Sequence, residues 1–173
     1  MSDSPPRSAP RRLAAARLAA VQALYQTEIT GAAVDDVIRD FVDHRVGGTA
    51  LMTPGGEETP EVEVELAAPD AVLFASIVRG ALERKADLDK MIDGALNEGW
   101  TVVRLEVLMR SILRAGAFEI STRSDIPPKV SISEYVNVAD AFYAGAEPGM
   151  VNAVLDRIAR VLRDGEIGSR AGA

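Results

Sequence analysis

The sequence contains no cysteine and a single histidine, His44. Without cysteine there is no disulfide framework, no cysteine-ligated zinc site and no thiol nucleophile. Such a composition is compatible with a reducing cytosol. No apolar run reaches the roughly 18 residues that a membrane-spanning helix needs, and the start of the chain, with prolines and charges, does not resemble a secretory signal. We therefore expect a cytoplasmic protein without a membrane partner.

The common motifs of catalysis are missing as well. No glycine-rich loop leads into Lys-Ser or Lys-Thr, and no HExxH sequence occurs. His44 is predicted to lie at a helix end beside a glycine-rich segment, where a lone histidine is more often solvated than catalytic. The carboxylates cluster in one segment without the fixed ligand spacing of a calcium loop. We predict a binding protein rather than an enzyme, with no metal and no other cofactor.

Positive charge is scarce except at the N-terminus. The chain has a formal net charge of −7. Its first 20 residues nevertheless hold one acid and four arginines, for a net charge of +3: Asp3, Arg7, Arg11, Arg12 and Arg17. The other 153 residues hold 15 bases and 25 acids. A basic end on an acidic body suits a directed contact with phosphates, and a solvated terminus without a ligand is the alternative at this point.

Hydrophobic residues make up 47% of the chain and recur at three- and four-residue spacing. This pattern predicts an all-α protein of six or seven helices with no convincing sheet. Ser131 and Glu134 match a capping box, with Ser131 as the cap. The predicted helices cover about residues 10–29, 34–44, 70–96 with a bend near Lys85, 103–121, 131–143 and 149–163. The helix at 103–121 is apolar almost all round, which is typical of the centre of a bundle.

Residues 45–68 interrupt the helical pattern with four glycines and two prolines. The stretch EVEVEL alternates as a strand does, but no strand to pair with it is predicted. We expect a mobile, acidic insertion in one helical domain of residues 11–163. Residues 1–10 and 164–173 are predicted to be disordered tails.

Two sets of polar side chains are candidate contact residues. Glu106, Arg110 and Arg114 recur every four residues and would share a helix face. They would form either an ion-pair stripe within the helix or an exposed edge that contacts a phosphate or a partner. Gln22 and Tyr25 would share an edge of the first helix, where glutamine can read a base and tyrosine can stack on one. A solvent-facing glutamine and a tyrosine at the edge of the core are the alternative.

Several motifs, taken in order, resemble the NusB family of bacterial transcription antitermination factors. They are AVQALYQ, then W…RLE…RSILRAGAFEI, then DIPPKVSISEYVNVADAF, and finally MVNAVLDRI. The resemblance covers about residues 11–163. It implies an all-helical fold of two small packed bundles and a non-enzymatic role. It also implies that the protein pairs with ribosomal protein NusE and binds boxA RNA of ribosomal RNA leader transcripts, and that it acts with other Nus factors to help RNA polymerase read through terminators.

The resemblance also implies which residues make contacts. In the family, RNA is bound by an arginine-rich N-terminus and by the start of the last helix. The corresponding RNA-binding candidates are Arg7, Arg11, Arg12, Arg17, Gln22, Tyr25 and Met150, and the partner-binding candidates are Glu106, Arg110 and Arg114. Ala14 and Ala15 occupy two positions that are usually arginine in the family, so the basic residues here lie further toward the N-terminus.

Two other interpretations remain open at this stage. The chain would be the NusB-like RNA-binding domain of a ribosomal RNA methyltransferase, or a helical scaffold that has lost RNA binding through Ala14 and Ala15. An apolar helix face would also allow a homodimer.

Overall fold

Eight α-helices carry the fold of the computed structural model, which describes residues 8–45, 48–52, 62–66 and 69–167. They are α1 (Ser8–Thr30), α2 (Val34–Asp40), α3 (Ala71–Glu83), α4 (Lys85–Ala95), α5 (Val107–Thr122), α6 (Pro128–Phe142), α7 (Glu147–Leu162) and α8 (Asp164–Ile167). A single π-helical turn, Phe41–Arg45, follows α2, and a 3-10 turn, Val102–Arg104, precedes α5. The predicted all-α class is confirmed.

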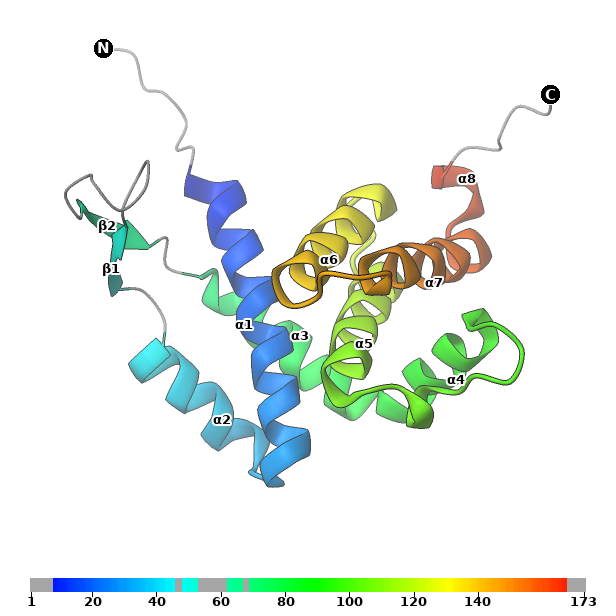
Figure 1. Cartoon of the computed structure of the whole chain (residues 1–173), viewed down its shortest axis with the longest axis horizontal. Coiled ribbons are helices and arrows are strands. Elements are labelled where there is room, and N and C mark those ends of the chain that lie inside the picture. The colour runs from blue at the N-terminus through cyan, green and yellow to red at the C-terminus, as the bar shows by residue number, and fades with distance from the viewer. Residues whose placement is uncertain (1–7, 46–47, 53–61, 67–68, 168–173) are drawn as a thin grey trace, which may run out of the picture.

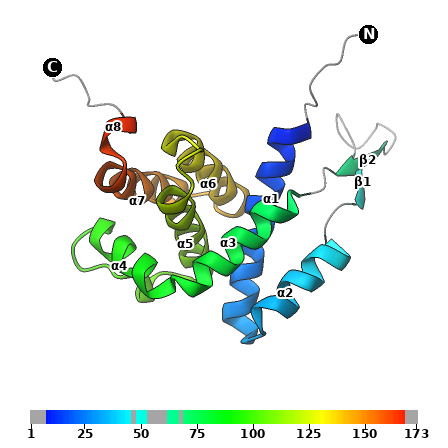
Figure 2. The same cartoon turned by 180° about the vertical axis from the view of Figure 1, so that it is seen from behind.

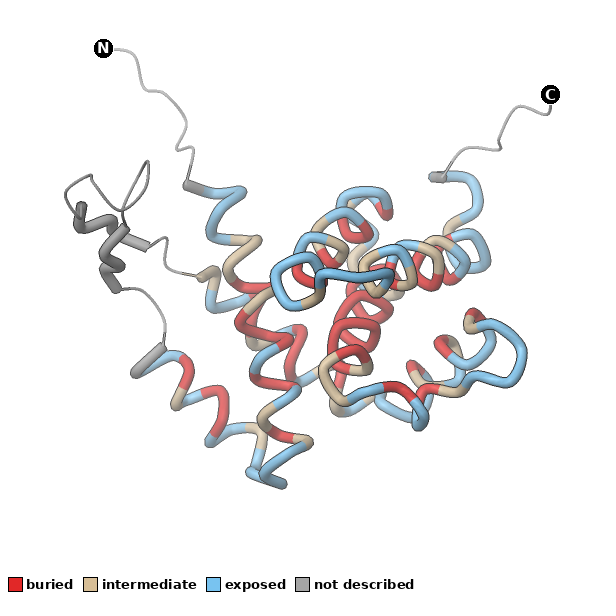
Figure 3. Tube along the Cα trace, in the orientation of Figure 1, coloured by how far each residue is buried: buried red, intermediate tan, exposed pale blue. Residues whose placement is uncertain are grey.

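Helix α5 occupies the middle of the molecule. Helices α1, α2 and α3 lie on one side of it, and α4, α6 and α7 lie on the other (Figures 1 and 2). Every residue of α5 from Ser111 to Ile120 is buried, and Figure 3 shows this as a continuous red stretch along the helix. This confirms the prediction, from its nearly uniform apolar character, that this helix lies at the centre of the bundle.

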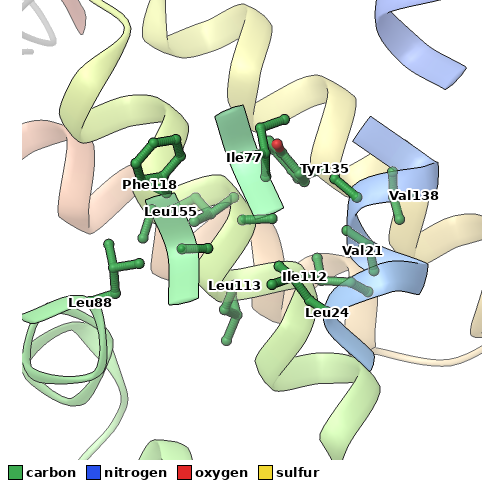
Figure 4. Close-up of a cluster of buried hydrophobic side chains, with 14 of the residues drawn as sticks. Val21, Leu24, Ile77, Leu88, Ile112, Leu113, Phe118, Tyr135, Val138 and Leu155 are labelled. Carbon is green, nitrogen blue, oxygen red and sulfur yellow. The ribbon is translucent and has the colours of Figure 1, made fainter. Parts of the chain in front are cut away.

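One continuous hydrophobic core joins the two sides. Figure 4 shows side chains from six helices converging around α5: Val21, Leu24, Ile77, Leu88, Ile112, Leu113, Phe118, Tyr135, Val138 and Leu155. Complete burial of a large aliphatic or aromatic side chain contributes about 1.5–3 kcal/mol. The rings of Phe41 and Phe74 stack with centroids 5.6 Å apart, which joins the π-helical turn after α2 to α3.

Two predicted chain breaks have clear local causes. Gly31 ends α1 in the left-handed region, with φ 67°, and its N–H donates to the Thr27 carbonyl at 2.9 Å. Glycine adopts this conformation without steric cost. The bend expected near Lys85 is the junction between α3 and α4 at Arg84.

The predicted capping box is wrong. Helix α6 begins at Pro128, one turn earlier than expected, because proline at the first helical position has no N–H to leave unpaired. Ser131 therefore lies inside the helix, and its hydroxyl donates to Glu119 Oε1 at 3.0 Å.

A pair of antiparallel strands is the other departure from expectation. β1 (Gly48–Met52) pairs with β2 (Val62–Leu66), and Ala50 lies opposite Val64. The prediction that EVEVEL has no strand to pair with is thus wrong, because residues 48–52 supply the second strand. The helices also reach into both predicted tails, at residues 8–10 and 164–167. Residues 1–7, 46–47, 53–61, 67–68 and 168–173 lie outside the described residues, and so does the mobility expected there.

A pair of glycine substitutions tests the close packing of α3 on α5. A Cβ at Gly80 would lie well inside contact distance of the Phe118 ring, whereas a Cβ at Gly94 would meet no described atom within 4 Å apart from its chain neighbours and the nearby backbone of its own helix. We expect Gly80→Ala to destabilise the fold by about 1–3 kcal/mol through overpacking. Gly94→Ala, within α4, should stabilise it by up to ~1 kcal/mol. Urea denaturation measures both changes, and equal effects would contradict the packing.

Candidate nucleic-acid and partner interface

The basic end of the molecule is the first part of α1. Arg11 and Arg12 lie in the opening turns of this helix and are exposed. The backbone N–H of Asp70, which caps α3, donates to the Arg12 carbonyl at 3.0 Å. The end of α1 is thereby tied to the start of α3. Arg7 lies outside the described residues.

Arg17 is not part of this exposed surface. It is 3% exposed, and its Nε donates to both carboxylate oxygens of Glu119 at 3.1 and 3.0 Å. Its Nη2 donates to Oε1 of the same carboxylate at 2.6 Å. The structure thus places Arg17, which the sequence analysis grouped with the RNA-binding candidates, inside the fold, where its charge is paired with that of Glu119. Periodicity alone placed it correctly on the helix but could not reveal a partner 102 residues away.

Glu119 is the centre of a larger polar network. In addition to Arg17 it accepts the hydroxyl of Ser131 at 3.0 Å and that of Tyr135 at 2.8 Å. All four side chains are buried, and Arg17 also lies 3.6 Å from the half-buried Glu134. The network joins α1, α5 and α6 at one point.

This environment shifts two ionisation equilibria. Burial acts to lower the pKa of Arg17, but the hydrogen bonds and charge of Glu119 outweigh it and leave the pKa above its usual value. Burial, together with the neighbouring carboxylate of Glu119, raises the pKa of Tyr135 well above its usual value. Arg17 is thus cationic and Tyr135 neutral at physiological pH.

An open groove of about 700 Å³ lies between the C-terminal half of α1, the start of α5 and the end of α6. Its lining is Gln22, Tyr25, Gln26, Ile29, Thr30, Glu106, Leu108 and Phe142. Tyr25, Ile29 and Phe142 are 39%, 57% and 42% exposed, so the groove presents apolar surface to solvent. Of the residues predicted to make contacts, the structure brings Gln22, Tyr25 and Glu106 together here.

The sequence prediction missed Ile29, Leu108 and Phe142. Each is apolar and lies near a helix end, where the hydrophobic pattern does not distinguish a core residue from an exposed one. Glu106 stands at the edge of the groove, just before α5, and accepts a hydrogen bond from the hydroxyl of Tyr143. The groove therefore combines an apolar floor with one negative charge.

Arg110 and Arg114 lie in α5 and pair with acids on neighbouring helices. Arg114 donates to Asp89 of α4 at 2.7 and 3.0 Å and to Glu28 of α1 at 2.8 Å. Arg110 lies 2.7 Å from the other oxygen of Glu28. These ion pairs connect different helices and do not form a stripe within α5. Arg114 is buried and so does not lie on an exposed edge. These arginines hold α1, α4 and α5 together.

Met150 lies in the first turn of α7, half-buried against the hydrophobic core. Only part of its side chain is open to a ligand. Within the described residues no group of three or more acidic or histidine side chains is arranged to hold a metal ion. None of the helices in the described part of the chain combines the length and apolar character needed to cross a bilayer.

The fold defines an all-helical protein whose N-terminal helix carries both a basic end and one wall of an apolar groove. The chain belongs to the NusB family, whose sequence model matches residues 14–160. It is 47% identical over 175 residues to the transcription antitermination protein NusB of Rhodospirillum rubrum, covering 94% of this chain and 95% of the relative. The corresponding protein of Caulobacter vibrioides is 47% identical over 150 residues, covering 86% and 93%.

Solved structures share the fold. T. maritima NusB superposes with a TM-score of 0.69 at 24% identity, covering 90% of this chain and 96% of that one. A chain in the crystal structure of antitermination factors NusB and NusE with double-stranded RNA gives a TM-score of 0.65 at 20% identity, covering 87% and 98%. Family membership agrees with the prediction of a non-enzymatic protein.

The Tyr135–Glu119 contact predicts how stability depends on high pH. Tyrosine in an unfolded chain titrates near pH ~10, and burial holds the pKa of Tyr135 above that value. Below pH ~10 the folded and the unfolded states both keep the phenol proton of Tyr135. At higher pH the unfolded chain loses it first, so stability falls as pH rises.

We expect the free energy of unfolding, measured by urea titration, to drop steeply above pH ~10. The drop should be smaller in Tyr135→Phe, which is expected to be less stable at neutral pH by about 1.5–3 kcal/mol because it loses a hydrogen bond to a charged group. An unchanged slope in the variant would contradict the assignment.

Proposed function

We propose that the protein is a transcription antitermination factor that binds boxA RNA of ribosomal RNA leader transcripts together with ribosomal protein NusE. In this role it promotes read-through by RNA polymerase with the other Nus factors and supports ribosomal RNA synthesis. Membership in the NusB family carries the proposal. Such a protein works in the cytoplasm, where bacterial transcripts are made.

The basic end of α1 is the RNA-binding part of the proposal. Arg11 and Arg12 are exposed on α1, and the rest of the chain is strongly acidic. Phosphates are therefore attracted to this end and repelled elsewhere, which orients an RNA strand as well as binding it. Arg7 lies further along the same terminus and would add to this contact. Met150, at the start of α7, stays a candidate second contact.

The groove is the partner-binding part of the proposal. Tyr25 and Phe142 are exposed aromatic residues in a concave apolar surface, and aromatic anchors often dominate protein interfaces. Glu106 at the edge suits a basic partner such as a ribosomal protein. Arg110 and Arg114 support this proposal indirectly, because they fix the helices that form the groove.

The two remaining interpretations are less well supported. The curated relatives are antitermination proteins matched over most of their own length, which favours this function over the RNA-binding domain of a methyltransferase. A scaffold without RNA binding would keep the groove and its partner but show no affinity for RNA. Self-association through the groove would compete with the partner, and sedimentation of the free protein detects it.

The central experiment measures binding of a boxA RNA and of a scrambled RNA at two salt concentrations, with and without NusE. We expect NusE to raise both affinity and the preference for boxA. No gain from NusE would refute the proposal, and NusE binding without RNA binding would favour the scaffold.

Removing the exposed arginines should weaken RNA binding through lost phosphate contacts. In Arg11→Ala/Arg12→Ala we expect a lower affinity and a salt dependence reduced by about 1–2 in the slope of log K against log salt. The control is Arg39→Ala/Arg160→Ala, which removes the same charge from exposed sites on α2 and α7. Equal losses in the two variants would show that only net charge matters.

Truncating the aromatic residues of the groove should weaken partner binding without affecting RNA contacts at the basic end. We expect Tyr25→Ala and Phe142→Ala each to lower affinity for NusE about tenfold or more, as buried aromatic anchors do. Val72→Ala, at an apolar residue of α3 that is 81% exposed, should change it little. Isothermal titration calorimetry measures all three, and unchanged binding in both aromatic variants would move the partner site elsewhere.

A further inference from the structure

The buried face of α1 is rich in small side chains, and Val21 and Leu24 are its larger apolar residues. Ala16, Ala19, Ala20 and Ala23 are all buried where α1 meets its neighbours. Methyl groups form a smooth surface with few interlocking projections, and loosely interlocked cores specify a unique arrangement poorly. Packing by these alanines holds α1 close to the bundle but opposes sliding or rotation weakly.

The Arg17–Glu119 pair is directional where the alanines are not. Three hydrogen bonds of 2.6–3.1 Å join the two side chains, and both are almost inaccessible to solvent. A shift of α1 by one residue would rotate it by roughly 100° and move it by about 1.5 Å. Glu119 would then be left buried without its cation, which is strongly unfavourable.

Glu119 is itself held in place. Ser131 and Tyr135 of α6 donate to its two oxygens, so the carboxylate cannot follow a displaced arginine. The ion pair therefore fixes the position of α1 relative to both α5 and α6. Near the N-terminal end of α1 the backbone N–H of Asp70 also donates to the Arg12 carbonyl, and near its C-terminal end Glu28 pairs with Arg110 and Arg114.

We propose that Arg17 and Glu119 are positioning residues for RNA recognition: their buried ion pair fixes the rotation and axial position of α1 and thereby aims Arg11 and Arg12. These arginines lie six and five residues before Arg17 on the same helix, so a fixed Arg17 fixes them as well. The inference rests on the proposed function, because it assumes that the basic end binds RNA.

The first test measures the position of α1 directly. The natural absence of cysteine allows paired spin labels at Ala9→Cys on α1 and Ser133→Cys on α6, both exposed positions. A control pair, Asp87→Cys and Asn152→Cys, reports on α4 and α7, which the ion pair does not touch. Double electron–electron resonance gives the distance distribution for each pair.

The variant to compare is Arg17→Met/Glu119→Gln, which removes both charges together and keeps one acceptor oxygen, for either Ser131 or Tyr135. We expect the α1–α6 distribution to become at least twofold broader, with the control pair unchanged. A distribution as narrow as that of the parent protein would overturn the proposal.

A conservative variant keeps the test decisive if the neutral pair does not fold, which loss of the control distance would reveal. Arg17→Lys retains the buried charge but loses the planar fork of donors. It should broaden the α1–α6 distribution to a smaller extent. An unchanged distribution in a folded Arg17→Lys would then decide against the proposal.

The second test asks whether the ion pair acts through the exposed arginines. We expect Arg17→Met/Glu119→Gln to weaken boxA RNA binding about tenfold in the otherwise unchanged protein, and to have little further effect once Arg11→Ala/Arg12→Ala is present. Equal losses in both backgrounds would overturn the proposal. Failure of the parent protein to bind RNA would instead refute the proposed function, and the spin-label distances would still test the positioning of α1.

Discussion

A buried carboxylate, Glu119, organises the polar interior of this protein. It lies in the central helix α5 and accepts hydrogen bonds from α1 through Arg17 and from α6 through Ser131 and Tyr135. An isolated charge in such a place would destabilise the fold, because burial removes its hydration. The three donors replace that hydration, and each of them must stand in one position to do so. The buried carboxylate is thus stable only while α1, α5 and α6 keep this arrangement.

A second ionic cluster performs a similar task at the other end of α1. Arg114 bridges Asp89 of α4 and Glu28 of α1, and Arg110 shares the same glutamate. Replacing a well-made buried ion pair by apolar residues is often neutral for stability, so its contribution is better sought in specificity of arrangement than in energy. The alanine-rich face of α1 packs against the bundle. The ionic contacts then fix the position of this helix relative to α4, α5 and α6.

Helix α1 is also the element that carries both candidate surfaces. Its N-terminal turns expose Arg11 and Arg12, and its C-terminal half forms one wall of the groove with Gln22, Tyr25 and Ile29. RNA and a protein partner bound to the same rigid helix would be held in a fixed relation to each other. Under the proposed function, this arrangement would let a small acidic protein recognise RNA and a partner together through one helix.

The sequence by itself determined the class of fold, because the spacing of apolar residues reports which faces are buried. That spacing located the central helix, the end of α1 at Gly31 and the bend between α3 and α4, and the order of motifs identified the family. It could not determine the roles of Arg17, Arg110 and Arg114, since an arginine at a helical position has the same local pattern whether it faces solvent or a buried acid. Only the tertiary structure decided this, by bringing Glu119 to Arg17 from 102 residues away. The strand pair was missed for the same reason. A strand needs a second segment to pair with, and the alternating pattern of one segment does not show where that second segment lies.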